Sequence, residues 1–449
     1  MLKRIKLIGS ILILLLAFAC QPCTNNVQVN QEEWLKDAVI YEVNVRQYTP
    51  EGTFNAFAKH LPRLKKLGVD ILWLMPIHPI SKVKRKGSLG SYYSVADYKK
   101  INPEFGTLDD FKALVSKSHE MGFKVIIDWV ANHTGWDNPW IFEHPEWYTT
   151  DSTGAIISPD PGWTDVADLN FDQPAMRRAM INAMDYWLEE TDIDGFRCDV
   201  AWGVPIDFWE KARASFDSIK PVFMLAEDEG HPDFLNKAFN SNYAWHLHHI
   251  MNDVAQGKKD ATSISGYFNG LGDKYPAGAF PMQFITNHDE NSWQGTIEER
   301  MGKAGDAFAV FSFTIPGIPL IYSGQEAGLD KRLAFFEKDT IDWGNLKKQD
   351  FYHNLIQLKK ENQALWNGEY GGGIEFLKTT NPEKLLAYKR VKNGNTVLVV
   401  LNLSDDQIEG DVALGKTQKY TQFFNAGKIL LGGDANFEMN PWDYLIFVR

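Results

Sequence analysis

The sequence predicts an α/β fold: a (β/α)8 TIM barrel with a short insertion after its third strand and an antiparallel β-sandwich at its C-terminus. Three observations support this prediction. From about residue 38, short apolar runs alternate with helical segments, as in a βα-repeat. Several of the runs end in an acid, the arrangement by which such a barrel builds a site at the C-terminal ends of its strands. After about residue 365, short β-rich runs separated by turn residues replace this pattern.

Eight apolar runs are candidates for the barrel strands. A continuous apolar run of this length is typical of a strand that is buried on both faces of a parallel sheet. Seven runs are clear and an eighth is weaker, and they lie at 39–45, 71–77, 124–130, 195–200, 223–227, 242–246 (the weaker one), 281–289 and 318–322. Helical signals fill the intervals, such as the capping-box-like pair Thr107 and Asp110 and the apolar periodicity between 174 and 190. Eight strands are enough to close a barrel.

The chain outside these strands divides into four further segments. Residues 131–172 form a long connection rich in Trp, Pro, Asp and Gly, and a loop of that length in a compact domain is usually functional. We therefore predict a barrel over 36–364 that contains this insertion, and a C-terminal β-domain over 365–449. Residues 1–19 have the basic start and apolar stretch of a secretory signal peptide, and 20–35 would form a polar tether.

Cys20 follows Leu-Ala-Phe-Ala, which resembles a bacterial lipoprotein processing site; the alternative is an ordinary signal peptide with an incidental cysteine. A diacylated Cys20 with an additional amide-linked chain would give stable anchoring. We therefore expect a secreted protein, lipid-anchored in the bacterial cell envelope at the outer membrane, on the periplasmic side or at the cell surface. Cys23 would lie in the tether and Cys198 in a strand, so no disulfide framework is expected.

The net charge of the chain limits the kinds of molecule that it is expected to bind. Loss of residues 1–19 removes three basic residues and no acids, which leaves 43 basic and 58 acidic residues and a net charge of −15. Such acidity argues against a nucleic-acid partner and favours a soluble protein with a neutral substrate. We expect a monomer without an organic cofactor.

Two strand ends carry residues suited to acid–base and nucleophilic chemistry. Arg197 and Asp199 are two apart in a predicted strand, so their side chains leave the same face. The guanidinium is expected to lower the pKa of Asp199 and keep it ionised, as a nucleophile requires; a buried structural ion pair is the alternative. Glu227 is followed by two more acids, and crowding in a partly apolar pocket would raise its pKa and suit a general acid. Alternatively, all three are solvated loop charges.

His288 and Asp289 end another apolar run, and a His–Asp pair could also indicate a metal site or a hydrolase triad. A Gly-x-Ser-x-Gly elbow and a His-Glu-x-x-His motif are both absent from the sequence. A serine hydrolase or a zinc enzyme is therefore disfavoured.

Taken together, these segments resemble the α-amylase family of glycoside hydrolases (family 13), here of the bacterial lipoprotein type, over about residues 38–449. Four segments look like the family's signatures: Asp128-Trp-Val-Ala-Asn132-His133, Gly195-Phe-Arg197-Cys-Asp199, Glu227 and Asn287-His288-Asp289. The resemblance implies that Asp199 is the nucleophile, Glu227 the acid/base and Asp289 the transition-state stabiliser. It also implies that His133 and His288 hydrogen-bond the sugar, that Tyr93 stacks beneath it, and that Asp128 holds Arg197.

The chain departs from the family at three positions. Trp202 and Gly203 stand where many α-amylases carry Lys-His, although Trp202 could supply a stacking surface for the leaving sugar. Asn170 stands where calcium-binding members carry Asp. Asn132 and Asp168 remain as candidate ligands, but a hard cation prefers carboxylate oxygens, so a Ca²⁺ site stays open.

The resemblance implies a retaining hydrolase that cleaves α-1,4-glucosidic bonds in starch-type glucans or maltooligosaccharides through a covalent glycosyl-enzyme. One alternative is a transglycosylase or α-glucosidase-type enzyme that acts on short α-glucosides on the same scaffold. A second is a non-catalytic sugar-binding relative, but such relatives typically lose catalytic acids and this chain keeps all three.

Overall fold

The computed structural model describes residues 32–272, 274–276 and 278–449. The predicted signal peptide, Cys20 and most of the predicted tether lie outside the described residues. In the part of the chain that is described, no helix combines the length and the apolar character needed to cross a bilayer.

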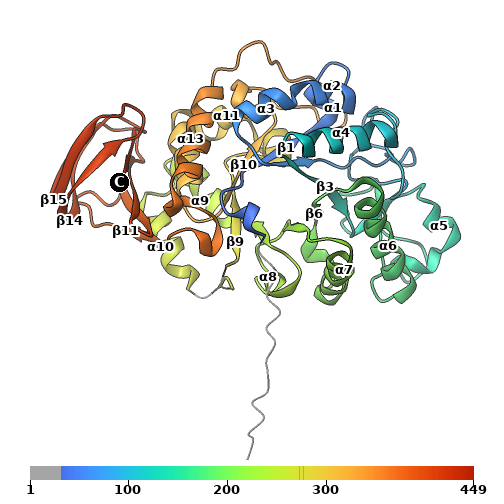
Figure 1. Ribbon diagram of the computed structural model, residues 1–449. Helices are drawn as coiled ribbons and strands as arrows, with labels where there is room; N and C mark the ends of the chain where they lie inside the picture. Colours follow the sequence, from blue (N-terminus) through green and yellow to red (C-terminus); the bar gives the residue numbers. More distant parts are fainter. Residues whose placement is uncertain (1–31, 273, 277) are drawn as a thin grey trace, which may run out of the picture.

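Eight parallel strands close into a barrel, as the sequence predicts (Figure 1). Around the barrel their order is β1, β10, β9, β8, β7, β6, β3 and β2. The strands are β1 (Ile40–Val43), β2 (Ile71–Leu74), β3 (Lys124–Val130), β6 (Gly195–Asp199), β7 (Phe223–Ala226), β8 (Ser241–Tyr243), β9 (Phe280–Gln283) and β10 (Ile318–Tyr322).

The strands β3 and β10 have the predicted bounds, whereas the other six end one to six residues before their predicted ends, and β8 and β9 differ most clearly. The weak candidate at 242–246 forms one residue earlier and ends sooner, because Trp245 already begins the helix α9 (Trp245–Ala255). The run at 281–289 is a strand only as far as Gln283, and Asp289 lies beyond it, directly before the π-helix η5 (Glu290–Gln294). The last acid of the predicted set therefore stands on a loop above the barrel and not on a strand.

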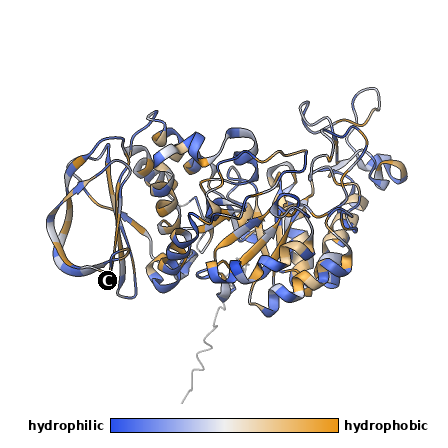
Figure 2. Ribbon diagram, turned by 90° about the horizontal axis from the view of Figure 1, so that it is seen from above, coloured by the Kyte–Doolittle hydropathy of each residue, from blue (hydrophilic) through white to orange (hydrophobic). Residues whose placement is uncertain are grey.

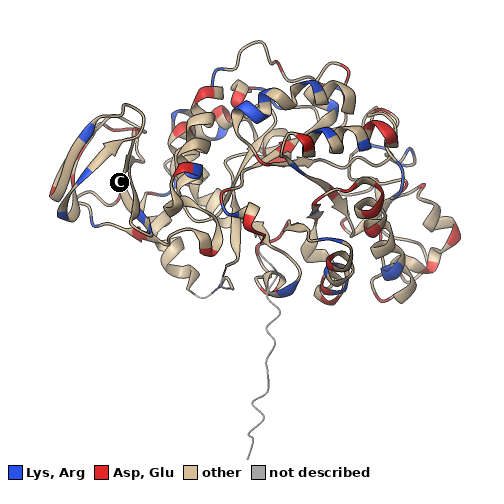
Figure 3. Ribbon diagram, viewed as in Figure 1, with Lys and Arg blue, Asp and Glu red and all other residues tan. Residues whose placement is uncertain are grey.

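Helices surround the barrel. They are α1 (Val45–Tyr48), α2 (Phe54–Phe57), α3 (Leu61–Leu67), α4 (Leu108–Glu120), α6 (Pro174–Thr191), α7 (Ile206–Ile219), α8 (Phe234–Lys237), α9 (Trp245–Ala255), α10 (Thr262–Leu271), α11 (Ile297–Met301), α12 (Gly305–Thr314) and α13 (Gln349–Glu361). The predicted capping box of Thr107 and Asp110 begins α4. Apolar residues concentrate in the barrel strands, and charged residues of both signs lie on the outer helices (Figures 2 and 3).

The barrel interior is filled by one apolar cluster that includes Ile40, Trp73, Ile126 and Leu225. Because strand residues alternate in direction, the residues two positions further along the strands, towards their C-terminal ends, point to the same side. Asp128 is paired in register with Arg197 on the neighbouring strand, and Val130 with Asp199. The apolar interior therefore ends in a layer of charged side chains at the C-terminal face.

Residues 131–172 contain a small subdomain next to this face. Its two strands, β4 (His133–Gly135) and β5 (Val166–Asp168), pair antiparallel, and α5 (Pro139–Glu143) lies between them in the sequence. The strand β4 follows β3 after only two residues, so this subdomain begins where the barrel strand ends.

The C-terminal domain is antiparallel, as predicted, and its strands join in one six-stranded sheet in the order β11, β12, β13, β16, β14 and β15. The strands are β11 (Ile374–Phe376), β12 (Leu385–Lys392), β13 (Asn395–Asn402), β14 (Ile408–Gln422), β15 (Lys428–Met439) and β16 (Tyr444–Val448). One face carries its own apolar cluster, which includes Leu398 and Val400. On the other face, Tyr388 and Val399 pack into the core of the barrel domain.

Candidate active site

A single buried guanidinium organises the site. Arg197 on β6 is fully buried, and its Nη1 lies 2.9 Å from Asp128 Oδ1 and 2.8 Å from Asp199 Oδ1. Its Nη2 lies 3.0 Å from Glu227 Oε2, and its Nε donates to the Tyr243 hydroxyl at 3.0 Å. One cation thus holds carboxylates from β3, β6 and the end of β7. Asp199 therefore forms the buried ion pair that was one alternative, and this contact does not exclude its use as a nucleophile.

The residue after Asp199 makes a turn that sequence patterns did not indicate. Val200 has a φ of 45°, in the left-handed region that a β-branched residue rarely enters. Its backbone N–H donates to Glu227 Oε2 at 2.8 Å, so the turn connects Asp199 with Glu227. Backbone strain of this kind costs about 1–3 kcal/mol and gathers at functional sites.

A second group of side chains surrounds His288. Its Nε2 lies 2.7 Å from the Tyr93 hydroxyl and 3.2 Å from Asp289 Oδ2. The Tyr93 hydroxyl donates to Asp128 Oδ2 at 3.1 Å, and the Tyr93 ring stacks on the imidazole with 5.4 Å between centroids. Through Asp128, this group is continuous with the Arg197 cluster.

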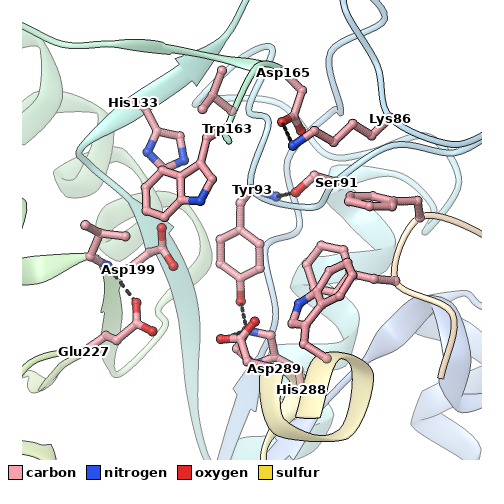
Figure 4. Close-up of a pocket in the computed structure, with 15 residues that line it drawn as sticks. Lys86, Ser91, Tyr93, His133, Trp163, Asp165, Asp199, Glu227, His288 and Asp289 are labelled. Atoms are coloured by element: carbon pink, nitrogen blue, oxygen red, sulfur yellow. Dashed lines mark hydrogen bonds and ion pairs between the residues drawn. The ribbon is translucent and has the colours of Figure 1, made fainter. Parts of the chain in front are cut away.

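The two groups face one cleft of about 420 Å³ (Figure 4). Six predicted site residues line it: Tyr93, His133, Asp199, Glu227, His288 and Asp289. Asp128 and Arg197 are fully buried and reach the cleft only through the residues they hold. Trp202 is not among the lining residues; it is 57% exposed on the short helix η4 (Ala201–Gly203).

Sequence reasoning missed part of the lining. The further residues are Lys86, Ser91, Trp163, Asp165, Val166, Val200, Trp293, Phe335 and Phe336. Lys86 and Asp165 form a 2.9 Å ion pair that joins the segment after β2 to the inserted subdomain. Trp163 and Asp165 lie in the connection 131–172, whose length predicts a functional loop, although neither residue was predicted individually. Phe335 and Phe336 lie in a segment without any motif.

Comparison with known proteins identifies the family. A model of the α-amylase catalytic domain matches residues 25–155 and 160–363. The chain belongs to the α-amylase family of glycoside hydrolases. A model of the maltogenic amylase C-terminal domain matches residues 374–446, which are most of the six-stranded sheet.

Individual family members agree over most of the chain. The crystal structure of a noncanonic maltogenic α-amylase from Thermotoga neapolitana superposes with a TM-score of 0.84 and 30% identity, covering 92% of this chain and 99% of that one. An α-amylase structure from Lactobacillus plantarum gives 0.82 and 29%, with the same coverage. An α-amylase of Haloarcula japonica is 29% identical over 83% of this chain, a match that spans 56% of its own length.

The carboxyl groups of this family member differ in proton affinity. Burial raises the pKa of Glu227 to about 7 and that of Asp199 to about 6, against the opposing charge of Arg197. Arg197 does act to lower the pKa of Asp199, as expected, but burial and the nearby Asp128 outweigh it, so the prediction of a net lowered pKa is wrong. Burial would also raise the pKa of Asp289, but the charge and hydrogen bond of His288 hold it below its usual value.

These directions predict a bell-shaped dependence of kcat/KM on pH. Activity falls on the acid side as Asp199 takes up a proton, and on the alkaline side as Glu227 loses one, so we expect a maximum between about 6 and about 7. Initial rates on maltoheptaose from pH 4 to 9 measure the profile. A plateau that extends unchanged to pH 9 would exclude Glu227 as the group that must be protonated.

The candidate calcium ligands do not form a suitable donor set. The Asn132 amide nitrogen lies 3.3 Å from His133 Nδ1. Gly203 packs so closely against the Asn132 amide oxygen that a Cβ at position 203 would lie only 2.5 Å from it. Asp168 supplies the only carboxylate of the pair, whereas Ca²⁺ takes six to eight oxygens. Among the described residues, no three or more His, Cys, Asp or Glu side chains converge as a metal site would require. We therefore assign no step of the chemistry to calcium.

It follows that chelation should leave this family member active. After dialysis against EDTA in large excess over trace metal, we expect kcat and the melting temperature to be unchanged. A fall in melting temperature that Ca²⁺ restores and Mg²⁺ does not would instead establish a structural calcium site.

Proposed function

We propose that the protein is a retaining glycoside hydrolase that cleaves α-1,4-glucosidic bonds in maltooligosaccharides and starch-type glucans. The observation that carries the proposal is the convergence of Asp199, Glu227 and Asp289 on one cleft, with the first two held by the same guanidinium. Retaining enzymes need their two carboxyl groups about 5–5.5 Å apart, and inverting enzymes need more room for a water. Two carboxylates that share one guanidinium favour the shorter separation.

In the first step, an Asp199 carboxylate oxygen attacks the anomeric carbon while the Glu227 carboxyl gives its proton to the departing glycosidic oxygen. This forms a glycosyl ester on Asp199 and releases the leaving sugar. In the second step, Glu227, now ionised, takes a proton from a water that attacks the same carbon, and the ester bond breaks. Asp289, kept ionised by His288, binds sugar hydroxyls more strongly as positive charge develops.

The walls of the cleft fit a sugar chain. Tyr93, Trp163, Trp293 and Phe335 bring aromatic faces to it, and flat amphipathic rings suit the apolar faces of pyranoses. Relatives with matching sequences are named α-amylase and cyclomaltodextrinase, and α-1,4-glucans are the substrate class that we carry over. Trp202 lies two residues after the left-handed turn at Val200, and we propose that its exposed ring stacks on the leaving sugar.

The proposal is tested by product analysis. The purified domain is incubated with maltoheptaose, amylose and pullulan, and the size and anomeric form of the first products are followed by NMR. We expect shorter maltooligosaccharides released first as α-anomers. Initial β-anomers would contradict retention, and products longer than the substrate would favour the transglycosylase alternative.

The N-terminal expectations also remain proposals. We propose that Cys20 is acylated after signal cleavage and anchors the enzyme in the cell envelope, because a basic start, an apolar stretch and a small-residue site precede it. Metabolic labelling with a fatty-acid analogue should mark the wild-type chain and not Cys20→Ala. Equal labelling of both would exclude this anchor.

A further inference from the structure

Glu42 is a buried carboxylate that the family resemblance leaves without a role. It lies on β1, has no exposed surface, and follows Ile40 by two residues, so its side chain points into the barrel. Its Oε1 lies 2.5 Å from His288 Nδ1. Its Oε2 is buried and has no hydrogen-bond partner among the described residues. The charge of Glu42 is therefore balanced chiefly through the imidazole of His288.

The hydrogen bonds around His288 determine its protonation state. At Nδ1 it faces Glu42; burial raises the pKa of this carboxyl, and the charge and hydrogen bond of His288 oppose that rise. The ionised carboxylate can only accept, so with Glu42 ionised Nδ1 carries a proton. At Nε2 it faces Asp289 Oδ2 and the hydroxyl of Tyr93. The single hydroxyl proton of Tyr93 is donated to Asp128, so that oxygen accepts from Nε2. Both ring nitrogens must then donate, which only the imidazolium can do.

We propose that Glu42 is a positioning residue that holds His288 as a doubly protonated cation, through which Asp289 and Tyr93 are fixed for the sugar. This inference rests on the proposed function for its consequence in catalysis, but the state of His288 can be measured without substrate. In the structure both ring nitrogens of His288 have protein partners, while the side chain also lines the cleft.

The charged and titratable groups around His288 come from several elements. Glu42 lies on β1, Asp128 on β3 and Arg197 on β6, while Tyr93 and Asp289 come from loops. Burial alone would lower the pKa of His288, but the charges of Asp289 and Glu42 raise it well above its usual value. Without the charge of Glu42, Asp289 and the more distant Asp128 remain as anions, and the charge of Arg197 opposes their effect on His288. The pKa of His288 should then fall toward the assay range.

The first test uses the wild-type chain. Histidine side chains are labelled with ¹⁵N, and the His288 signals are identified by their loss in His288→Gln. We expect both ring nitrogens to show the shifts of protonated, N–H-bearing nitrogens up to pH 8. A neutral His288 at pH 7 would overturn the proposal, whatever the enzyme proves to hydrolyse.

The second test uses Glu42→Gln, which keeps the shape and a hydrogen-bonding oxygen but removes the charge. We expect His288 to titrate below about pH 7, where Glu227 sets the alkaline limb of kcat/KM in the wild type, so that this limb moves to lower pH. We also expect a loss on the order of 10- to 100-fold at pH 7, as for a charge-assisted hydrogen bond. In the His288→Gln background the same change should have little further effect. An equal loss at all pH values, or in both backgrounds, would make Glu42 merely structural.

Asp194→Asn is the matched control. Asp194 Oδ2 lies 2.7 Å from His119 Nε2, a similar carboxylate–imidazole contact, but Asp194 precedes β6 and so lies at the opposite end of the barrel strands from the cleft. We expect lower stability without a shift of the pH profile. If this control moved the alkaline limb as Glu42→Gln does, the effect would not be specific to His288.

Discussion

Asp199→Asn is expected to lower kcat/KM on maltoheptaose by about 10⁴- to 10⁶-fold, the range seen when a nucleophile is removed. The amide has nearly the same shape as the carboxylate, but its oxygen is too weak a nucleophile to form the glycosyl ester. The side chain lines the cleft and accepts from Arg197 at 2.8 Å, a contact that the amide oxygen can keep. The loss should therefore appear in kcat and not in the fold.

The same substitution should leave the melting temperature unchanged or raise it. Asp128, Asp199, Glu227 and Asp289 crowd around one arginine, and the repulsion among them contributes to the raised pKa of Asp199. Removing one negative charge relieves that repulsion, a common trade between stability and activity. Thermal unfolding of both proteins at pH 7 measures the effect. A fall of several degrees would indicate that Asp199 serves the fold.

A suitable control for Asp199→Asn is Asp217→Asn. Asp217 lies on α7, is half exposed, and pairs with Arg213 at 2.8 Å on the outside of the barrel. Arg213 is buried but keeps its hydrogen bonds to Asn240 and to the Ala238 carbonyl, so we expect wild-type kinetics and a modest loss of stability. A loss of activity comparable with that of Asp199→Asn would mean that the assay reports general damage and not chemistry.

The fold was largely predictable because its signals are local. An apolar run that ends in an acid marks both a buried parallel strand and the edge where the strand meets the site. The strand β6 ends at Asp199, and Glu227 directly follows β7, so both obey this rule. The rule weakens where pairing is short: β8 has three residues, and the run before Asp289 leaves the sheet six residues early. Whether the C-terminal strands form one sheet or two depends on which strands pair across long distances in the sequence, and no local pattern indicates this pairing.

The site was predictable in its acids but not in their environment. The motifs identify Asp199 and Glu227, yet the left-handed turn at Val200 depends on the contact of its N–H with Glu227 Oε2, which only the fold creates. The pKa of Asp199 was predicted in the wrong direction because the sequence shows the adjacent Arg197 but neither the burial of the carboxyl group nor its proximity to Asp128. Glu42 was missed because a single acid in an apolar strand has no motif, and its partner lies 246 positions away.

Arg197→Met is expected to destabilise the fold by about 3–5 kcal/mol at pH 8, the cost of leaving buried charges without their partner, and to abolish activity. Asp128, Asp199 and Glu227 would lose the cation that they share, so their pKa values in the folded state should rise further. A carboxyl group with a raised pKa in the folded state stabilises the fold at low pH, and this contribution to stability is lost as pH rises. The loss of stability in Arg197→Met should therefore be small at pH 5 and large at pH 8. Unfolding in urea at both values measures it.

Two variants separate charge from geometry in this prediction. Arg197→Lys restores one positive charge, but a single ammonium cannot reach three carboxylates as the fork of a guanidinium does, so we expect part of the stability and little of the activity to return. Arg390→Met removes an equally buried arginine of β12 that donates to backbone carbonyls, including those of Ile315 and Gly372. The loss of stability in Arg390→Met should be similar at pH 5 and pH 8, and its kcat should equal that of the wild type. If the loss of stability in Arg197→Met were also independent of pH, the carboxylates around Arg197 would not be its cause.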